Sequence, residues 1–182
     1  QYGVYANQYS APTISNSTIS NNQYGIRTQD YAVPIVTDSV ISNNQYGIYG
    51  SWYAGGVTIA TSTISNNSGR GVYAYEPTGD FIISNSIISD NSGYGIYYLR
   101  AQSGASLTVS DSTISNNSSY GIYGDCCWAG GIIIATSTIS NNSGYGVYVY
   151  GSQKAVTITS STITGNSGQG ITFSYARSGS SL

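Results

Sequence analysis

Residues that commonly carry out catalysis are scarce in this sequence. It contains no histidine, the most frequent general base and metal ligand, so acid–base chemistry would fall to its seven carboxylates. These are scattered, and Asp38 and Asp111, which occupy equivalent positions of a sequence repeat, are three copies apart. Stacking at strand spacing would separate them by about 14 Å, whereas a glycosidase pair needs about 5 to 10 Å. We therefore predict no enzymatic activity, no metal site and no cofactor.

The basic residues indicate no binding site either. Arg27, Arg70, Arg100, Lys154 and Arg177 are isolated along the chain, and we expect them to be solvated surface groups. Charged residues make up 7% of the sequence and the formal net charge is −2, so nucleic acid and anionic membranes are not expected partners. No apolar run approaches the roughly 18 residues of a membrane-spanning helix.

Tyrosine is the residue type with the clearest potential for surface contact, with 19 copies. One set follows a Gly-Ile or Gly-Val pair directly, and we expect it to form an outward-facing row. Such a row suits lateral packing between molecules or stacking on sugar rings, although strands also favour aromatic residues for their own sake. The set consists of Tyr5, Tyr49, Tyr73, Tyr97, Tyr123 and Tyr148, and the last five are the predicted surface-contact residues.

The two cysteines are adjacent, at Cys126 and Cys127. In an exported protein such a pair would bridge to other subunits or form a strained vicinal disulfide, because no other cysteine is available in the chain. Free thiols are the third alternative, and the sequence leaves all three open.

These residues are embedded in a repeat that predicts the fold. The segment Ser62-Thr63-Ile64-Ser65-Asn66-Asn67 occurs in seven copies with small variations. Each copy is preceded by a short apolar run and followed three or four residues later by glycine and a β-branched residue. The period of about 22 to 26 residues and the period-2 alternation predict an all-β, right-handed parallel β-helix of about seven coils, with three short strands per coil. We expect residues 1–182 to form one domain.

The paired asparagines at the end of each segment have different roles. The first position accepts Asn, Asp or Gly, which indicates a left-handed backbone with positive φ. The second position is always Asn, so we predict that its amide forms a ladder along the stack. A small inward serine is expected at the corner that begins each segment. The predicted ladder comprises Asn22, Asn44, Asn67, Asn91, Asn117, Asn142 and Asn166.

The repeat resembles that of pectate-lyase-like β-helix proteins and of many prokaryotic surface and sheath proteins. The resemblance covers essentially the whole chain and implies the fold, but this fold hosts lyases, hydrolases, adhesins and inert stalks. The clustered acids and the aspartate and histidine sets that its lyases and hydrolases use are absent from the sequence.

The function that we predict is a self-assembling structural subunit of an extracellular filament, sheath or surface layer, with copies of itself as partners. The alternative is a carbohydrate-binding adhesin or stalk segment that holds cell-surface glycans with its tyrosines. A third alternative, ice binding through regular threonines, is disfavoured because Tyr, Asp and Asn are expected to interrupt the array. The near absence of lysine and glutamate and the lack of methionine, even at position 1, fit an exported chain.

Overall fold

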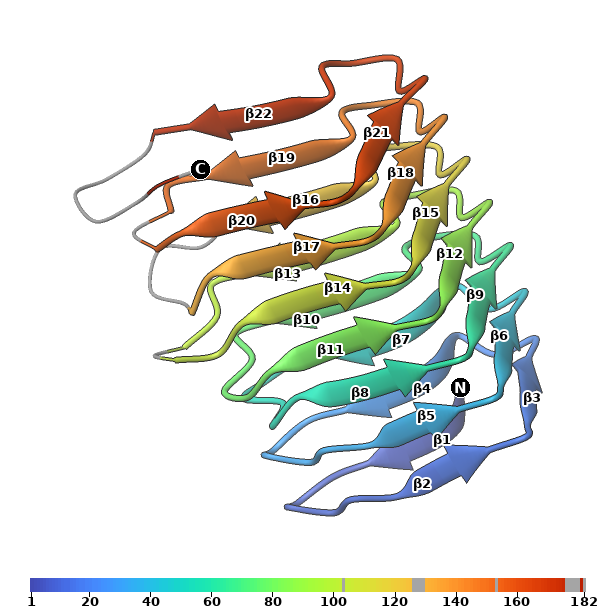
Figure 1. Cartoon of the computed structure of the whole chain (residues 1–182). Coiled ribbons are helices and arrows are strands. Elements are labelled where there is room, and N and C mark those ends of the chain that lie inside the picture. Colours follow the sequence, from blue (N-terminus) through green and yellow to red (C-terminus); the bar gives the residue numbers. More distant parts are fainter. Residues whose placement is uncertain (103, 126–129, 153, 176–180, 182) are drawn as a thin grey trace.

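Short strands rich in Ile, Val and Thr wind into a stack of coils, because no single coil can bury its apolar face without a neighbour. The computed structural model describes residues 1–102, 104–125, 130–152, 154–175 and 181. The described part contains 22 strands in three parallel sheets and no helix. Figure 1 shows the three sheets running the length of the stack. The predicted β-helix with three strands per coil is confirmed.

Each sheet takes one strand from every coil, so its strands are separated by a full coil in sequence. Sheet A consists of β1 Tyr2–Ala6, β4 Tyr24–Thr28, β7 Tyr46–Gly50, β10 Val72–Tyr75, β13 Ile96–Leu99, β16 Ile122–Asp125, β19 Val147–Tyr150 and β22 Ile171–Ser174. Sheet B consists of β2 Thr13–Ser15, β5 Ile35–Thr37, β8 Val57–Ala60, β11 Phe81–Ser84, β14 Leu107–Ser110, β17 Ile132–Ala135 and β20 Val156–Thr159. Sheet C consists of β3 Thr18–Ser20, β6 Val40–Ser42, β9 Thr63–Ser65, β12 Ile87–Ser89, β15 Thr113–Ser115, β18 Thr138–Ser140 and β21 Thr162–Thr164.

The register places equivalent repeat positions directly above one another. Val4 pairs with Ile26, 22 residues later, and Ile96 pairs with Ile122, 26 residues later, so the predicted range of coil lengths is confirmed. Most of the extra residues lie where the chain passes from sheet A to sheet B, and Figure 1 shows loops leaving the stack along that edge. One more lies in the turn from sheet C to sheet A, where Gly25 follows Asn22 by three residues but Gly71 follows Asn67 by four. The corner between sheets B and C is only two residues long in every coil.

Three aliphatic rows fill the interior, one from each sheet. The central members Ile48, Ile59 and Ile64 are fully buried and belong to one continuous core. Burial falls off in the last coil, where Ile171 is 40% exposed because no further described coil covers it. The core therefore consists of nearest-neighbour contacts between coils, as in other solenoids.

Left-handed backbone occurs at both corners that flank sheet C in each coil, although the sequence indicated only one of them. Positive φ at the first turn asparagine is confirmed, with 55° at Asn66 and 66° at Gly165. The residue before the inward serine also has positive φ, with 46° at Thr61 and 47° at Thr136. Such values are unfavourable for β-branched side chains, so these two corners hold backbone strain.

The glycine that recurs in each repeat is required by close packing between coils. A Cβ atom on Gly47 would lie 2.5 Å from the carbonyl oxygen of Gly71 and 2.6 Å from Cγ2 of Ile64. The same clash recurs up the stack at Gly95, Gly121 and Gly146. Glycine thus lets the chain turn into sheet A directly against the next coil.

Candidate functional site: a tyrosine face and two interior ladders

The outer face of sheet A carries the predicted tyrosine row. Strand alternation turns Ile48 inward and Tyr49 outward, and the ladder register aligns each tyrosine with the next. The row continues through every coil from Tyr5 to Tyr148, except that an arginine replaces tyrosine in the second coil. In order it consists of Tyr5, Arg27, Tyr49, Tyr73, Tyr97, Tyr123 and Tyr148.

A second row precedes the glycines and packs against the first. Tyr94 stacks on Tyr97 with ring centroids 4.5 Å apart, and Tyr24 meets Tyr49 edge-on at 4.9 Å. We call the two rows together the tyrosine face. Its second row consists of Tyr2, Tyr24, Tyr46, Tyr94, Tyr120 and Tyr145.

Two arginines are built into this face, which corrects the expectation that they are isolated surface groups. The Arg70 guanidinium lies 4.4 Å from the ring centroid of Tyr97 and 4.8 Å from that of Tyr73. Arg27 lies 5.4 Å from the centroid of Tyr24 and donates a hydrogen bond of 3.1 Å to the Tyr2 hydroxyl. The contacts of Arg70 with Tyr73 and Tyr97, and of Arg27 with Tyr24, are cation–π interactions. Sequence inspection missed them because each arginine meets rings from neighbouring coils.

Mutual packing also perturbs the phenol groups. The pKa of Tyr73 is raised to about 12, first by burial and then by the nearby Tyr49 hydroxyl. The pKa of Tyr123 is raised to about 12 by burial and then by the Tyr97 hydroxyl. Arg70 acts in the opposite direction on the Tyr73 pKa, but burial outweighs it. These phenols therefore stay protonated well above the pH at which a free tyrosine ionises.

The ring faces of the predicted contact residues are largely covered by one another. Tyr73 and Tyr97 stack with an interplanar angle of 18°, as do Tyr123 and Tyr148. Rings stacked along the solenoid present their edges outward, whereas a sugar stacks on a free ring face. The row is thus partly buried, and it is less open than the sequence indicated.

Inside the stack, the asparagine ladder is confirmed. Asn91 Nδ2 donates to Asn117 Oδ1 at 2.9 Å, and Asn91 Oδ1 accepts from both the backbone N–H and Nδ2 of Asn67. Asn91 Nδ2 also donates to the carbonyl oxygen of Ile64. Each buried amide therefore satisfies itself and a neighbouring coil, which accounts for the unvarying asparagine.

A serine ladder runs parallel to it at the corner between sheets B and C. Ser86 Oγ donates to the carbonyl oxygen of Ser84 at 2.7 Å and accepts the backbone N–H of Ser62 at 3.1 Å. The same pair of bonds recurs at Ser39 and Ser112. The expected small inward hydroxyl is confirmed.

Two of the carboxylates illustrate structural roles, one in a corner and one in a loop. Asp38 accepts a hydrogen bond of 2.7 Å from the Thr61 hydroxyl, and Asp80 accepts one of 2.8 Å from Ser106. No group of three His, Cys, Asp or Glu side chains that could hold a metal ion occurs in the described part of the chain. Cys126 and Cys127 lie outside the described residues.

The outer face of sheet B differs from the array expected for the ice-binding alternative. Its central row alternates threonine with isoleucine, and neither Tyr, Asp nor Asn interrupts it, so the reason given against that alternative is wrong for this sheet. The isoleucines nevertheless break the row of hydroxyl groups at every second coil. The row consists of Thr13, Ile35, Thr58, Ile82, Thr108, Ile133 and Thr157.

The sheets, the coil register and the interior ladders define a parallel β-helix solenoid. The family model described as "Right handed beta helix region" matches residues 1–129 and 101–182. The chain therefore belongs to the right-handed β-helix family. No curated protein and no solved structure gives a significant match. β-Helix domains are often extracellular or surface proteins, and no helix of the described residues is suited to cross a membrane.

Proposed function

We propose that this protein is a non-enzymatic structural subunit that assembles with copies of itself into an extracellular filament, sheath or surface layer. The observation that carries the proposal is the complementarity of the two ladder ends. Among the described residues, Asn22 Oδ1 accepts no hydrogen bond and the Asn166 N–H donates none. In every coil between them, an oxygen and an N–H at these positions bond to each other.

The strand edges complement one another in the same way. β1, β2 and β3 form one edge of the three sheets, and β22, β20 and β21 form the other. A second copy placed on the last coil would continue all three sheets and the asparagine ladder in register. Such a contact is heterologous, so it propagates into a filament.

The tyrosine face supports lateral contact between such filaments. Its outward ring edges and hydroxyl groups form a rigid polar and aromatic strip, held in place by Arg27 and Arg70. Bridging through Cys126 and Cys127 remains part of the proposal, although both lie outside the described residues. Glycan binding is the second candidate, but the covered ring faces of Tyr73, Tyr97 and Tyr123 favour it less.

The absence of catalysis is proposed on the residue set. The sequence has no histidine, and Asp38 and Asp111 lie at equivalent corners with φ of 50° and 49°, three coils apart. Asp38 is engaged with Thr61 in the wall of the solenoid. A carboxylate that is hydrogen-bonded within a corner of the solenoid suits a structural role better than a role in an acid–base pair.

The test is electron microscopy and sedimentation velocity of the purified chain at micromolar concentration, with and without reductant. We expect polymers that lengthen with concentration. Ile171→Lys would place a charge in the end-to-end contact and should give monomers, because a buried unpaired charge costs several kcal/mol. Ile133→Lys is the matched control, since Ile133 has a similar exposure, 42%, but faces outward from sheet B.

A monodisperse monomer at every concentration would overturn the proposal, and so would equal polymer formation by both variants. Polymers that shorten under reductant would assign a bridging role to the cysteine pair. If the chain stays monomeric, glycan-array binding that is lost in Tyr97→Ala would support the second candidate instead.

A further inference from the structure

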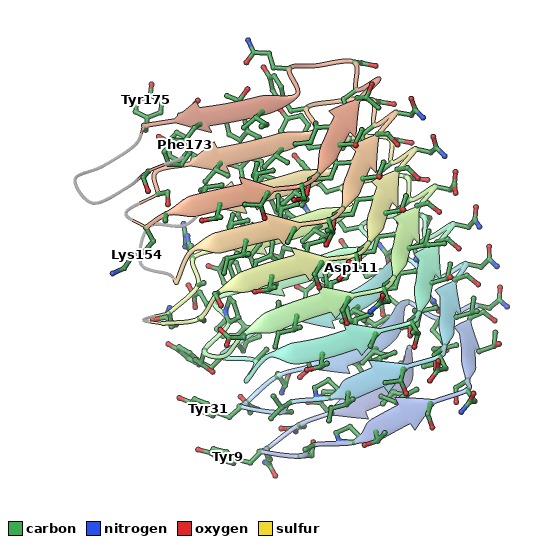
Figure 2. The ribbon with its side chains drawn as sticks, in the orientation of Figure 1. Tyr9, Tyr31, Asp111, Lys154, Phe173 and Tyr175 are labelled. Atoms are coloured by element: carbon green, nitrogen blue, oxygen red, sulfur yellow. The ribbon has the colours of Figure 1, made fainter. Side chains whose placement is uncertain are left out.

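A separate group of tyrosines lies away from sheet A, at the loop edge between sheets A and B. Tyr9, Tyr31 and Tyr53 occupy equivalent loop positions in the first three coils. The rings of Tyr9 and Tyr31 stack almost in parallel, with centroids 5.1 Å apart and an interplanar angle of 7°, and Tyr53 follows at 6.3 Å. Figure 2 shows Tyr9 and Tyr31 projecting together from this edge. They form a short aromatic ladder outside the packed sheets.

The backbone at these tyrosines is strained. Their φ angles are 61°, 65° and 61°, and the residue before each also has positive φ. Two successive residues of this kind form a type I′ turn, which strongly prefers Asn-Gly, and tyrosine in a left-handed conformation costs about 1 to 2 kcal/mol. The hydrogen bond from the Ser10 N–H to the Asn7 carbonyl closes the first turn.

Burial does not compensate for this strain. Tyr9 is 76% exposed and Tyr31 is 43% exposed, so neither ring adds much to the core. A strained residue whose side chain is left in solvent indicates a role other than stability. The same type of ring recurs in three consecutive coils, which places reactive phenols side by side at an accessible edge.

We propose that Tyr9 and Tyr31 are a site of oxidative dityrosine cross-linking, with hydrogen peroxide as oxidant and a haem peroxidase as catalyst. Each phenol loses one electron and one proton to give a tyrosyl radical. The two radicals join through a carbon–carbon bond between ring carbons ortho to the hydroxyl groups, and the ring protons at those carbons move to the oxygens to restore both phenols. Overall, two tyrosines and one peroxide give one dityrosine and two waters.

The surroundings favour this pair over the tyrosine face. Coupling requires the ortho carbons to meet, so the rings must rotate out of their stack, and the exposed rings at the loop edge have room to do so. Tyr73 and Tyr97 are held between neighbouring rings and the Arg70 guanidinium. Burial also raises the pKa of these two phenols, to about 12 for Tyr73, which disfavours loss of the proton.

The consequence would be a covalent link between the first two coils. Tyr9 and Tyr31 are 22 residues apart in the chain, a full coil, although the Tyr9 N–H donates a hydrogen bond to the neighbouring Asp30 carbonyl. A bond between the loops would prevent the first coil from peeling away from the second. This inference does not depend on self-assembly, because the link lies within one molecule.

The test is treatment of the folded chain with a haem peroxidase and hydrogen peroxide at dilute protein concentration. We expect dityrosine fluorescence and loss of two hydrogen atoms in the intact mass at unchanged molecular size. Because trypsin cleaves after Arg27 and Arg70, digestion of the denatured product should give a peptide of residues 1–27 linked to one of residues 28–70. Tyr9→Phe and Tyr31→Phe keep the ring but should each abolish that linked peptide.

Tyr73→Phe is the matched control and should leave the linked peptide unchanged. Circular dichroism of each variant before oxidation establishes that the fold is retained. The proposal is overturned if the linked peptide persists in Tyr9→Phe, if fragmentation places the bond in the tyrosine face, or if the treated chain forms no intramolecular dityrosine.

Discussion

Replacement of Asn91 by alanine tests whether the asparagine ladder stabilises the solenoid. The Asn91 side chain is fully buried and takes part in four hydrogen bonds, two as donor and two as acceptor. Alanine leaves the backbone N–H and one Nδ2 hydrogen of Asn67 without their acceptor. Each unsatisfied buried donor costs about 1 to 3 kcal/mol, so we expect a loss of about 4 kcal/mol once the two lost donor bonds are included.

The assay is urea unfolding followed by far-ultraviolet circular dichroism. A loss of this size should lower the urea midpoint by roughly 1 to 4 M, because the free energy of unfolding usually falls by about 1 to 3 kcal/mol per M of urea. The matched control is Asn116→Gly, at the first position of the equivalent turn in the next coil, directly before the ladder residue Asn117. Asn116 is exposed and has φ of 56°, which glycine adopts freely, so its change should stay within about 0.5 kcal/mol.

Asn91→Asp adds a dependence on pH to the same test. The new carboxyl group would be buried and would face the Ile64 carbonyl and Asn117 Oδ1, so its folded pKa should lie above the unfolded value of about 3.9. Stability should therefore be highest below that unfolded value and should fall as pH rises toward the folded pKa. A loss below about 1 kcal/mol in Asn91→Ala, or a pH-independent Asn91→Asp, would refute the reasoning.

Three further predictions concern backbone packing, corner strain and the tyrosine face. Gly95→Ala should prevent folding or lower the melting temperature sharply, because its Cβ would lie 2.7 Å from the Gly121 carbonyl oxygen; soluble yield and thermal unfolding measure this. Thr136→Asn should stabilise the protein by about 1 kcal/mol, because asparagine tolerates the positive φ of 47° that is unfavourable for threonine. Thermal unfolding measures this, and an unchanged or lower melting temperature would contradict it. The folded pKa of Tyr73 and of Tyr123 is raised to about 12, so the contribution of these phenols to the free energy of unfolding should be fully present below pH 10 and should be lost between pH 10 and 12. Urea unfolding of the wild type and Tyr73→Phe at alkaline pH should show a smaller loss in the variant.

The interior was predictable from the sequence because its constraints repeat in every coil. An amide that must bond to its equivalents above and below allows only asparagine, so the pattern itself identifies the ladder through Asn91. The pairing of exposed groups was less predictable. Arg70 contacts rings from neighbouring coils, and the side-chain directions that bring it onto Tyr97 do not follow from spacing alone.

The ladder of Tyr9, Tyr31 and Tyr53 was missed for a related reason. It lies in the part of the repeat where coil length varies, so its members align only after the register of the strands is known. The signal was nevertheless present, since these tyrosines are spaced 22 residues apart, like the paired Asn22 and Asn44. The strain at Thr61 had no such signal, because threonine is not expected at positive φ.

The parallel stacking of coils has a mechanical consequence. The first coil and Ser181, which accepts a hydrogen bond from the Val156 N–H in the last coils, lie at opposite ends of the stack (Figure 1). A force applied to the two ends acts along the hydrogen bonds that join successive coils, so it loads one layer of bonds at a time. The solenoid should unzip in steps, each freeing one coil of 22 to 26 residues, or about 80 Å of extended chain. Under tension along its length, it would behave as a series of short extensible links.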